Sequence, residues 1–265
     1  MKTSIQSLGL TIAAISAAAA SYASDAIGPG DSDSLWIVGG GAITFNNIYV
    51  GEGNETVLFP NIAYNGERFF VKDGTLNLSV MQLNEFSAGL IVSPDAGFLS
   101  DEDEYEDNAK LAGLNERDAT LEGGFYINHT TDLGRLTFIL LTDLGSEHDG
   151  QTAGLKYTFD LQYAGWFVNP VIGFHWISDK KVDHYYGVSA AEATPLNTGG
   201  FVRTAYDGDS AFVVFAGLRA RYELTEHWDI NITSGVSRLG DGIKDSSIVD
   251  DDYVYHASAA VSYNF

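Results

Sequence analysis

Hydrophobic and polar residues alternate along most of the chain. In the last segment, one set of alternate positions is apolar and largely aromatic, and comprises Tyr253, Tyr255, Ala257, Ala259, Val261, Tyr263 and Phe265. The intervening positions are mostly small or polar, and comprise Val254, His256, Ser258, Ala260, Ser262 and Asn264. A period of two predicts a β-strand with one face toward an apolar medium and the other toward water.

The same period recurs along the chain and predicts strands at 35–45, 56–64, 67–72, 75–83, 85–93, 119–128, 135–144, 152–163, 166–176, 211–223, 228–238 and 253–265. Several approach the ~9–11 residues that cross a bilayer at a tilt, whereas strands of soluble proteins average about 5–6. We therefore predict an all-β fold, a closed antiparallel transmembrane β-barrel of twelve strands. The alternative is ten strands, if 56–64, which contains Pro60, and 67–72 form one bent excursion.

The connections between the predicted strands alternate in length. Those at one end are tight, and lie at 65–66, 84, 129–134, 164–165 and 225–227. The other end has the three longest connections, 94–118, 177–210 and 239–252, and one tight type I′-like turn at Asp73 and Gly74. Short periplasmic turns and long outer loops are typical of outer membrane barrels. Because a barrel of ~12 strands is narrower than a porin of ~16–18, we expect the long loops to fold partly into the lumen.

Residues 1–23 have the pattern of a secretory signal peptide. Lys2 supplies the positive charge, 8–20 the apolar stretch, and Ser21, Tyr22 and Ala23 a small-x-small cleavage site. We therefore expect a signal peptide at 1–23 and a single barrel domain at 24–265, in the outer membrane of a Gram-negative cell. Tyr263 and Phe265 resemble the C-terminal signal that the barrel assembly machinery recognises. That machinery, outer membrane lipid and lipopolysaccharide are thus expected partners.

Composition excludes other classes of function. Lys and Arg number 14 and Asp and Glu 36, a net charge of −22, which argues against a nucleic-acid partner. The absence of Cys excludes disulfides and thiolate chemistry. A mean hydropathy of −0.03 fits strands that interleave an apolar and a polar face.

Several short motifs are spread along the chain. A loop carries Tyr185, Tyr186, Gly187, Val188 and Ser189 followed by Glu192, and further segments are 111–114, 148–150, 222–228 and 245–249. These segments resemble the MltA-interacting protein (MipA)/OmpV family of outer membrane proteins over nearly the whole mature chain. In 245–249, Ser247 replaces the family's usual proline. The resemblance implies a scaffold or interaction protein linked to a murein (peptidoglycan) hydrolase or synthase, with no catalytic motif and no cofactor.

Two local groups suggest chemistry. Residues 101–107 hold six acids in seven positions, which suits hard cations such as Ca²⁺, but the segment lacks the turn and spacing of a dedicated site. We therefore expect no metal centre, with Asp101, Asp103, Glu104 and Asp107 as the weak candidates. His256 and Ser258 share one face of the last strand, and a serine beside a base can act as a nucleophile. An outer membrane hydrolase built on this pair is the least favoured hypothesis, and we expect a protein that is not an enzyme.

Charges of both signs are predicted to face the lumen. They are Glu122, Arg135, Lys156, Asp160, Arg219, Arg221 and Asp229, and buried charges of opposite sign are expected to pair. The main alternative to a scaffold is thus a narrow porin-like channel for small solutes, biased toward cations by its acidic outer loops.

Overall fold

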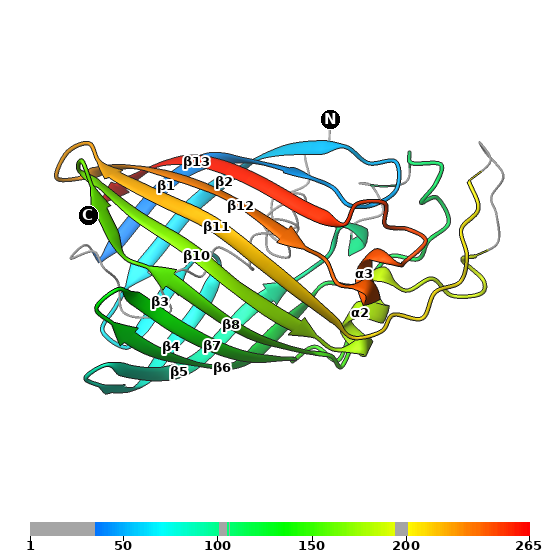
Figure 1. The fold of residues 1–265 in the computed structure, drawn as a ribbon, viewed down its shortest axis with the longest axis horizontal. Helices are drawn as coiled ribbons and strands as arrows, with labels where there is room; N and C mark the ends of the chain where they lie inside the picture. Colours follow the sequence, from blue (N-terminus) through cyan, green and yellow to red (C-terminus); the bar gives the residue numbers. More distant parts are fainter. Residues whose placement is uncertain (1–34, 101–104, 106, 194–200) are drawn as a thin grey trace.

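The chain forms one antiparallel sheet that closes into a barrel (Figure 1). The computed structural model describes residues 35–100, 105, 107–193 and 201–265. The strands are β1 (Trp36–Asn46), β2 (Asn54–Asn65), β3 (Phe69–Lys72), β4 (Thr75–Leu83), β5 (Phe86–Asp95), β6 (Thr120–Thr131), β7 (Gly134–Asp143), β8 (Gln151–Phe159), β9 (Leu161–Tyr163), β10 (Trp166–Ile177), β11 (Ala211–Glu223), β12 (Trp228–Arg238) and β13 (Tyr253–Asn264). Between them lie η1 (Phe98–Ser100), α2 (Asp179–Tyr186) and α3 (Asp241–Lys244). Within the described part of the chain, no helix is both long and apolar enough to cross a membrane.

Each strand pairs with its neighbours in chain order, and β13 returns to β1. The segments β8 and β9 both pair with β10 and are interrupted at Asp160, so the wall has twelve strands. This confirms the predicted count. The alternative of ten strands is wrong, because β2 and β3 are separate strands of opposite direction. The predicted signal peptide, 1–23, lies outside the described residues and stays a prediction, as does the division of the chain at residue 24.

The two faces of the wall follow the alternation in the sequence. Apolar side chains of the outward face stay exposed, as at Leu58 (79%), Val80 (65%) and Ile172 (54%). The inward positions of β13, among them His256 and Ser262, are largely buried. Lipid replaces water against the outward face, so these exposed apolar groups match their surroundings rather than oppose folding.

An aromatic girdle surrounds the end with the short turns. Trp36, Trp166 and Trp228 each lie directly opposite a tyrosine of the neighbouring strand, with ring centroids 4.8, 5.0 and 5.1 Å apart. Tryptophan and tyrosine prefer the membrane–water interface, because one part of each ring system is apolar and another part hydrogen-bonds. These three pairs therefore mark one edge of the hydrocarbon layer.

The connections lie as the sequence predicts. Tight turns and the C-terminus occupy the left-hand end of Figure 1, and α2, α3 and the long loops the right-hand end. The expected type I′-like turn is present, because Asp73 and Gly74 have φ values of 48° and 75°. By the rule that outer membrane barrels have short periplasmic turns, the left-hand end faces the periplasm.

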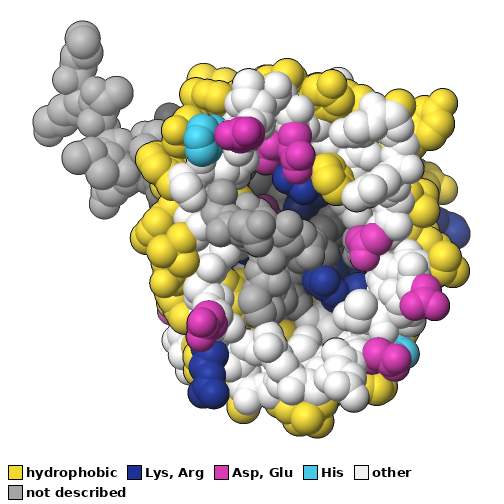
Figure 2. Space-filling view, turned by 90° about the vertical axis from the view of Figure 1, so that its left-hand side faces the viewer, with side chains coloured by type: hydrophobic (Ala, Val, Ile, Leu, Met, Phe, Trp, Pro, Cys, Tyr) yellow, Lys and Arg dark blue, Asp and Glu magenta, His cyan; other side chains and the backbone are white. Residues whose placement is uncertain are grey.

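The periplasmic end is hollowed (Figure 2), with lysine and arginine side chains inside the mouth and acidic side chains on the rim. Deeper in the wall, inward polar groups bond across strands. Thr137 donates to Asn128 at 2.8 Å, and Asn264 Nδ2 donates to Asp229 at 2.9 Å. Arg221 lies 3.4 Å from Asp229 and 3.2 Å from Glu223. These polar groups of the lumen are thus joined across neighbouring strands.

A proline interrupts one ladder of the wall and a side chain repairs it. Ser178 donates its backbone N–H to Gln151, which sets the register in which residue 170 faces Phe159 of β8. Pro170 has no N–H, and the Nδ2 of Asn169 donates to the Phe159 carbonyl instead, at 2.9 Å. Each strand carbonyl near the membrane needs a donor, because lipid offers none.

We predict that Asn169→Ala lowers the free energy of unfolding by about 1 kcal/mol, the typical value of one hydrogen bond. Adding Pro170→Val to this variant restores a backbone N–H opposite Phe159 and should recover most of the loss. Guanidinium unfolding of the barrel in lipid vesicles measures both differences. Equal stability of the single and double variants would show that the Asn169 bond does not repair the ladder.

Candidate functional site

The outer loops fold together into a cap with its own hydrophobic core. Its fifteen buried residues come from four connections and the adjoining strand end, and are Ile48, Tyr49, Val50, Leu99, Tyr105, Leu111, Leu114, Val182, Val188, Ala211, Val213, Leu239, Ile243, Ile248 and Val249. Residues this far apart in sequence form one core only where the loops meet over the barrel mouth. Within the described residues, the cap is the largest buried apolar cluster of the molecule. It confirms the expectation that the long loops fold inward.

Helix α2 is held to the wall by a buried ammonium group. The Nζ of Lys181 lies 3.0 Å from an oxygen of Asp95, at the end of β5, and 2.8 Å from one of Glu122, in β6. It also donates to Thr152 of β8 at 3.2 Å. Burial lowers the pKa of Lys181, but the two carboxylates more than offset this and raise it above the usual range. Lys181 is therefore charged at neutral pH and joins α2 to three strands.

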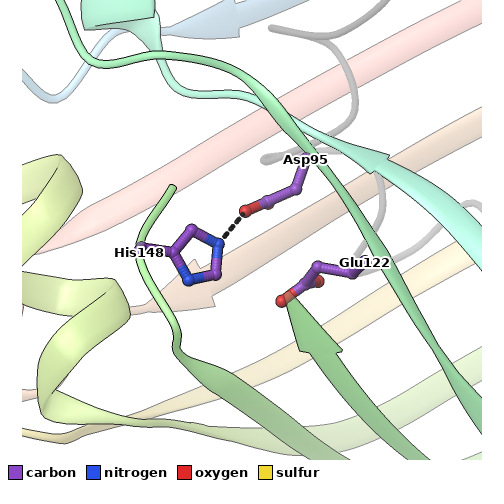
Figure 3. A group of neighbouring side chains, drawn as sticks. All are labelled: Asp95, Glu122 and His148. Carbon is purple, nitrogen blue, oxygen red and sulfur yellow. Dashed lines mark hydrogen bonds and ion pairs between the residues drawn. The ribbon is translucent and has the colours of Figure 1, made fainter. Parts of the chain in front are cut away.

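His148 completes this ionic cluster (Figure 3). Its Nδ1 accepts from the Gly150 N–H at 2.9 Å, so the ring proton of the neutral imidazole lies on Nε2 and is donated to Asp95 at 3.0 Å. The backbone N–H groups of His148 and Asp149 donate to Asp143 at 2.8 and 2.9 Å. The motif at 148–150 thus forms a turn that holds the His148 imidazole in hydrogen-bond contact with Asp95.

The same cluster resembles a metal site, since Asp95, Glu122 and His148 offer ligand atoms that all lie within 4.8 Å of one another. However, Lys181 already places a positive charge between the two carboxylates. A cation at this place would have to displace an ammonium group that is itself held by three partners. The donor set therefore fits an internal ion pair better than a metal centre.

The motif loop forms a second attachment within the cap. Glu192 accepts from the backbone N–H of Asn115 and of Ser189, at 2.9 and 2.8 Å, and pairs with Arg117 at 3.0 Å. Burial raises the pKa of Glu192, but these hydrogen bonds and the Arg117 charge outweigh it and lower the pKa to about 2. Arg203 donates to the Glu192 carbonyl at 2.7 Å. The loops 96–119 and 178–210 are thereby joined.

The two motif tyrosines lie at the centre of the cap. The hydroxyl of Tyr185 donates to Asp95 at 2.9 Å. It stays protonated, because burial, and next the Asp95 carboxylate, raise the pKa of Tyr185. The ring of Tyr186 stacks on Tyr49 at 5.9 Å, and burial raises its pKa to about 12. Gly187 accepts from Arg117 at 3.1 Å. Tyr185, Tyr186 and Gly187 of the motif therefore form part of the cap.

The remaining predicted site residues are spread over the barrel. Glu122 belongs to the ionic cluster, Arg219 pairs with Asp73 at 3.5 Å, and Arg221 pairs with Asp229. Of the other predicted lumen charges, Lys156 is buried, Asp160 accepts from Asn169, and Arg135 lies opposite Thr158. At the C-terminus, Tyr263 contacts Trp228, and Phe265 donates its N–H to the Trp36 carbonyl. Asp101, Asp103 and Glu104 lie outside the described residues, and Asp107 is exposed. The proposed nucleophile Ser258 bonds to Thr233 at 2.6 Å rather than to His256.

We predict that Lys181→Met opens the cap. The variant leaves Asp95 and Glu122 as a buried pair of like charges without the ammonium group between them, and removing one partner of a buried ion pair typically costs ~3–5 kcal/mol. The rate at which proteinase K cleaves the outer loops of the refolded barrel should therefore rise by roughly two orders of magnitude or more. Lys180→Met is the matched control, because the Lys180 side chain is 61% exposed on the same helix. Equal cleavage of both variants would contradict the role of Lys181.

We also predict an acid-dependent loosening at Glu192. Its folded-state pKa is depressed from 4.5 to about 2, so the ionised group stabilises the cap above pH about 4.5, and this contribution is lost as pH falls toward about 2. A fluorophore on Ala190→Cys, the chain's sole thiol, should gain rotational freedom over this range. In Glu192→Gln, the mobility should already be high at pH 6 and change little. A pH response unaffected by Glu192→Gln would assign it to another group.

Comparison with known proteins identifies the fold's relatives. The chain is 26% identical to the outer membrane protein YiaT of Escherichia coli K12, over 86% of this chain and 90% of that one. It is 23% identical to the MltA-interacting protein of the same organism, over 90% and 93%, and 24% identical to OmpV of Vibrio cholerae, over 88% of each. These relatives, and the barrel itself, place the chain in the outer membrane. The family described as "MltA-interacting protein MipA" matches residues 38–265, and the chain belongs to that family.

Proposed function

We propose that this protein is a non-enzymatic interaction protein of the outer membrane, which presents its periplasmic end to a murein hydrolase or synthase. The observation that carries the proposal is the asymmetry of the two ends. The outer mouth is covered by a cap with a buried core and two ionic attachments, whereas the described residues at the periplasmic end surround a hollow with acidic side chains on its rim (Figure 2). The printed name of one relative, MltA-interacting protein, supports a partner of this class.

The periplasmic rim offers a surface of defined charge. Exposed acids lie in four of its turns, at Glu67, Glu85, Asp132 and Glu226. These four acids outnumber Arg68, the exposed cation beside Glu67, so the rim attracts a basic surface and speeds association, because charge complementarity acts before contact. The proposed partner therefore docks through a basic patch onto these turns.

The alternative of a diffusive channel is tested by conductance. We expect the refolded protein to leave planar bilayers electrically silent, because the capped mouth offers small ions no wide aqueous path. The Lys181→Met variant is the informative comparison, since loosening the cap should produce current steps. Steady conductance of the unaltered protein would favour the channel instead.

The interaction is tested by charge reversal at the rim. We expect the variant with Glu67, Glu85, Asp132 and Glu226 all changed to Lys to lose most of its binding to a purified murein transglycosylase, measured by biolayer interferometry. The matched control reverses four exposed acids of the opposite end, Asp107, Glu116, Asp207 and Asp250, and should bind as the unaltered protein does. Equal binding by both variants, or none by the unaltered protein, would overturn the proposal.

A further inference from the structure

The wall of the barrel is incomplete beside β2. On one edge, β2 pairs with β1 along eleven residue pairs, from Trp36 opposite Tyr64 to Asn46 opposite Asn54. On its other edge, β3 pairs with it at Tyr64 and Asn65. Among the described residues, no strand therefore covers this edge of β2 from 54 to 63. We name the break between this edge and the end of β5, at 93–95, the β2–β5 gap.

The gap arises because the β3–β4 hairpin is short and leans inward. The hairpin ends in the tight turn at Asp73 and Gly74, while the neighbouring β5 continues to Asp95. The carboxylate of Asp73 lies 3.5 Å from Arg219 of β11, and β3 is five positions from β11 around the sheet. An ion pair across the lumen requires the tip of the hairpin to approach the barrel axis. The tip is thereby drawn away from the upper part of β2.

A proline faces the gap from each side. Asn65 donates its N–H to Leu35, so the odd residues of β2 bond to β1, and Pro60 faces the gap. Likewise Thr130 donates to Glu85, so the odd residues of β5 bond to β6, and Pro94 faces the gap. Proline is placed in sheets where its missing N–H has no partner to serve. Both edges are thus built to remain unpaired.

The position of the gap makes this break unusual. The outward side chains along the free edge include Leu58 and Ile62, which are 79% and 50% exposed, so the edge reaches the hydrocarbon layer. The inward-facing Val57 and Phe59 are themselves partly exposed. Unpaired backbone groups are tolerated at membrane depth only where they line an aqueous or ligand-filled space. The unpaired edge therefore indicates an aqueous or ligand-filled space beside it.

A cavity beneath the cap adjoins the outer end of the gap. It has a volume of about 130 Å³ and includes Glu55 of β2 and Phe98, which follows β5, so both sides of the gap contribute to its lining. Its other walls are largely apolar or aromatic, and include Phe45, Tyr49, Ile177, Val213 and Val254. The Glu55 carboxylate is already bonded to Asn47 at 2.6 Å. An apolar cavity of ~150 Å³ is large enough to hold benzene, so this one suits a hydrocarbon group of that size.

We propose that the β2–β5 gap is a lateral portal through which an apolar hydrocarbon group enters this cavity from the outer leaflet. The group is either a small aromatic or aliphatic solute or the acyl chain of a membrane lipid, which share the same chemistry. Entry from the side bypasses the cap, because the cap closes the axial path and leaves the wall at β2 open. The inference is independent of the proposed interaction at the periplasmic end.

The site is tested by photolabelling in lipid nanodiscs. One arm uses free trifluoromethyl-phenyldiazirine and the other a phosphatidylcholine that carries a diazirine at its acyl end, and mass spectrometry maps the labelled residues. We expect Phe45, Phe98 and Val213 to be labelled in at least one arm, which also identifies the source of the group. Val213→Trp fills the cavity and should lower this labelling roughly tenfold, equal to about 1.4 kcal/mol of binding. The control is Val214→Trp, on the lipid-facing side of the same strand, where the side chain is 57% exposed.

The portal is tested separately with spin labels, using the absence of Cys from the chain. Val57 and Ile43 are direct cross-strand partners that face the lumen, but Ile43 lies on a strand paired along both edges. A label at Val57→Cys should collide with oxygen dissolved in the bilayer several-fold more often than one at Ile43→Cys. Heat-dependent electrophoretic mobility confirms that each variant has folded. Equal collision rates, cavity residues unlabelled in both arms, or labelling unchanged by Val213→Trp would each overturn the proposal.

Discussion

Backbone hydrogen bonding in a solvent without donors or acceptors is the constraint on which the structure depends. In hydrocarbon, each N–H and C=O of a strand needs a partner, so the sheet closes and β13 returns to β1. Each strand proline is consistent with this requirement, because it lies where a ladder stops or is repaired. Pro170 is compensated by the Asn169 side chain, whereas Pro60 and Pro94 border the gap beside β2. Departures from a complete ladder are therefore informative about function.

The interior is organised by charge at two levels. Near the outer rim, Lys181 lies between Asp95 and Glu122 and attaches the polar helix α2 to the wall. Lower down, Arg219 reaches Asp73 across the lumen and draws in a hairpin. A buried ion pair contributes modestly to stability, but it specifies geometry, because a charge left without its partner is costly. In this barrel, the first pair holds α2 against the wall, and the second holds the tip of the β3–β4 hairpin toward the opposite side of the lumen.

The sequence predicted the wall far better than the cap. Period-two alternation and turn residues such as Asp73 and Gly74 act locally, so eleven of the predicted strands are continuous in the structure and the twelfth, 152–163, is broken at Asp160. The ionic cluster was not foreseen, because Asp95 ends one strand while His148 and Lys181 belong to two different connections, and the three meet only in the folded barrel. The family motifs contained His148 and Tyr185, which both donate to Asp95, without indicating these contacts. In the sequence around the gap, Pro60 and Pro94 are the indications of an unpaired edge. Which edge of its strand each proline faces is known only once the strand pairing is known.

The cap also bears on the order of assembly. Val50 donates to Ile248, and Tyr49 bridges to Val249, which joins the connection after the first strand to the one before the last. These contacts lie above the seam where β1 meets β13. Since these two connections are neighbours only across the seam, their contacts in the cap require β1 and β13 to be paired. The cap therefore also fastens the first strand to the last, outside the hydrogen-bond ladder that joins them.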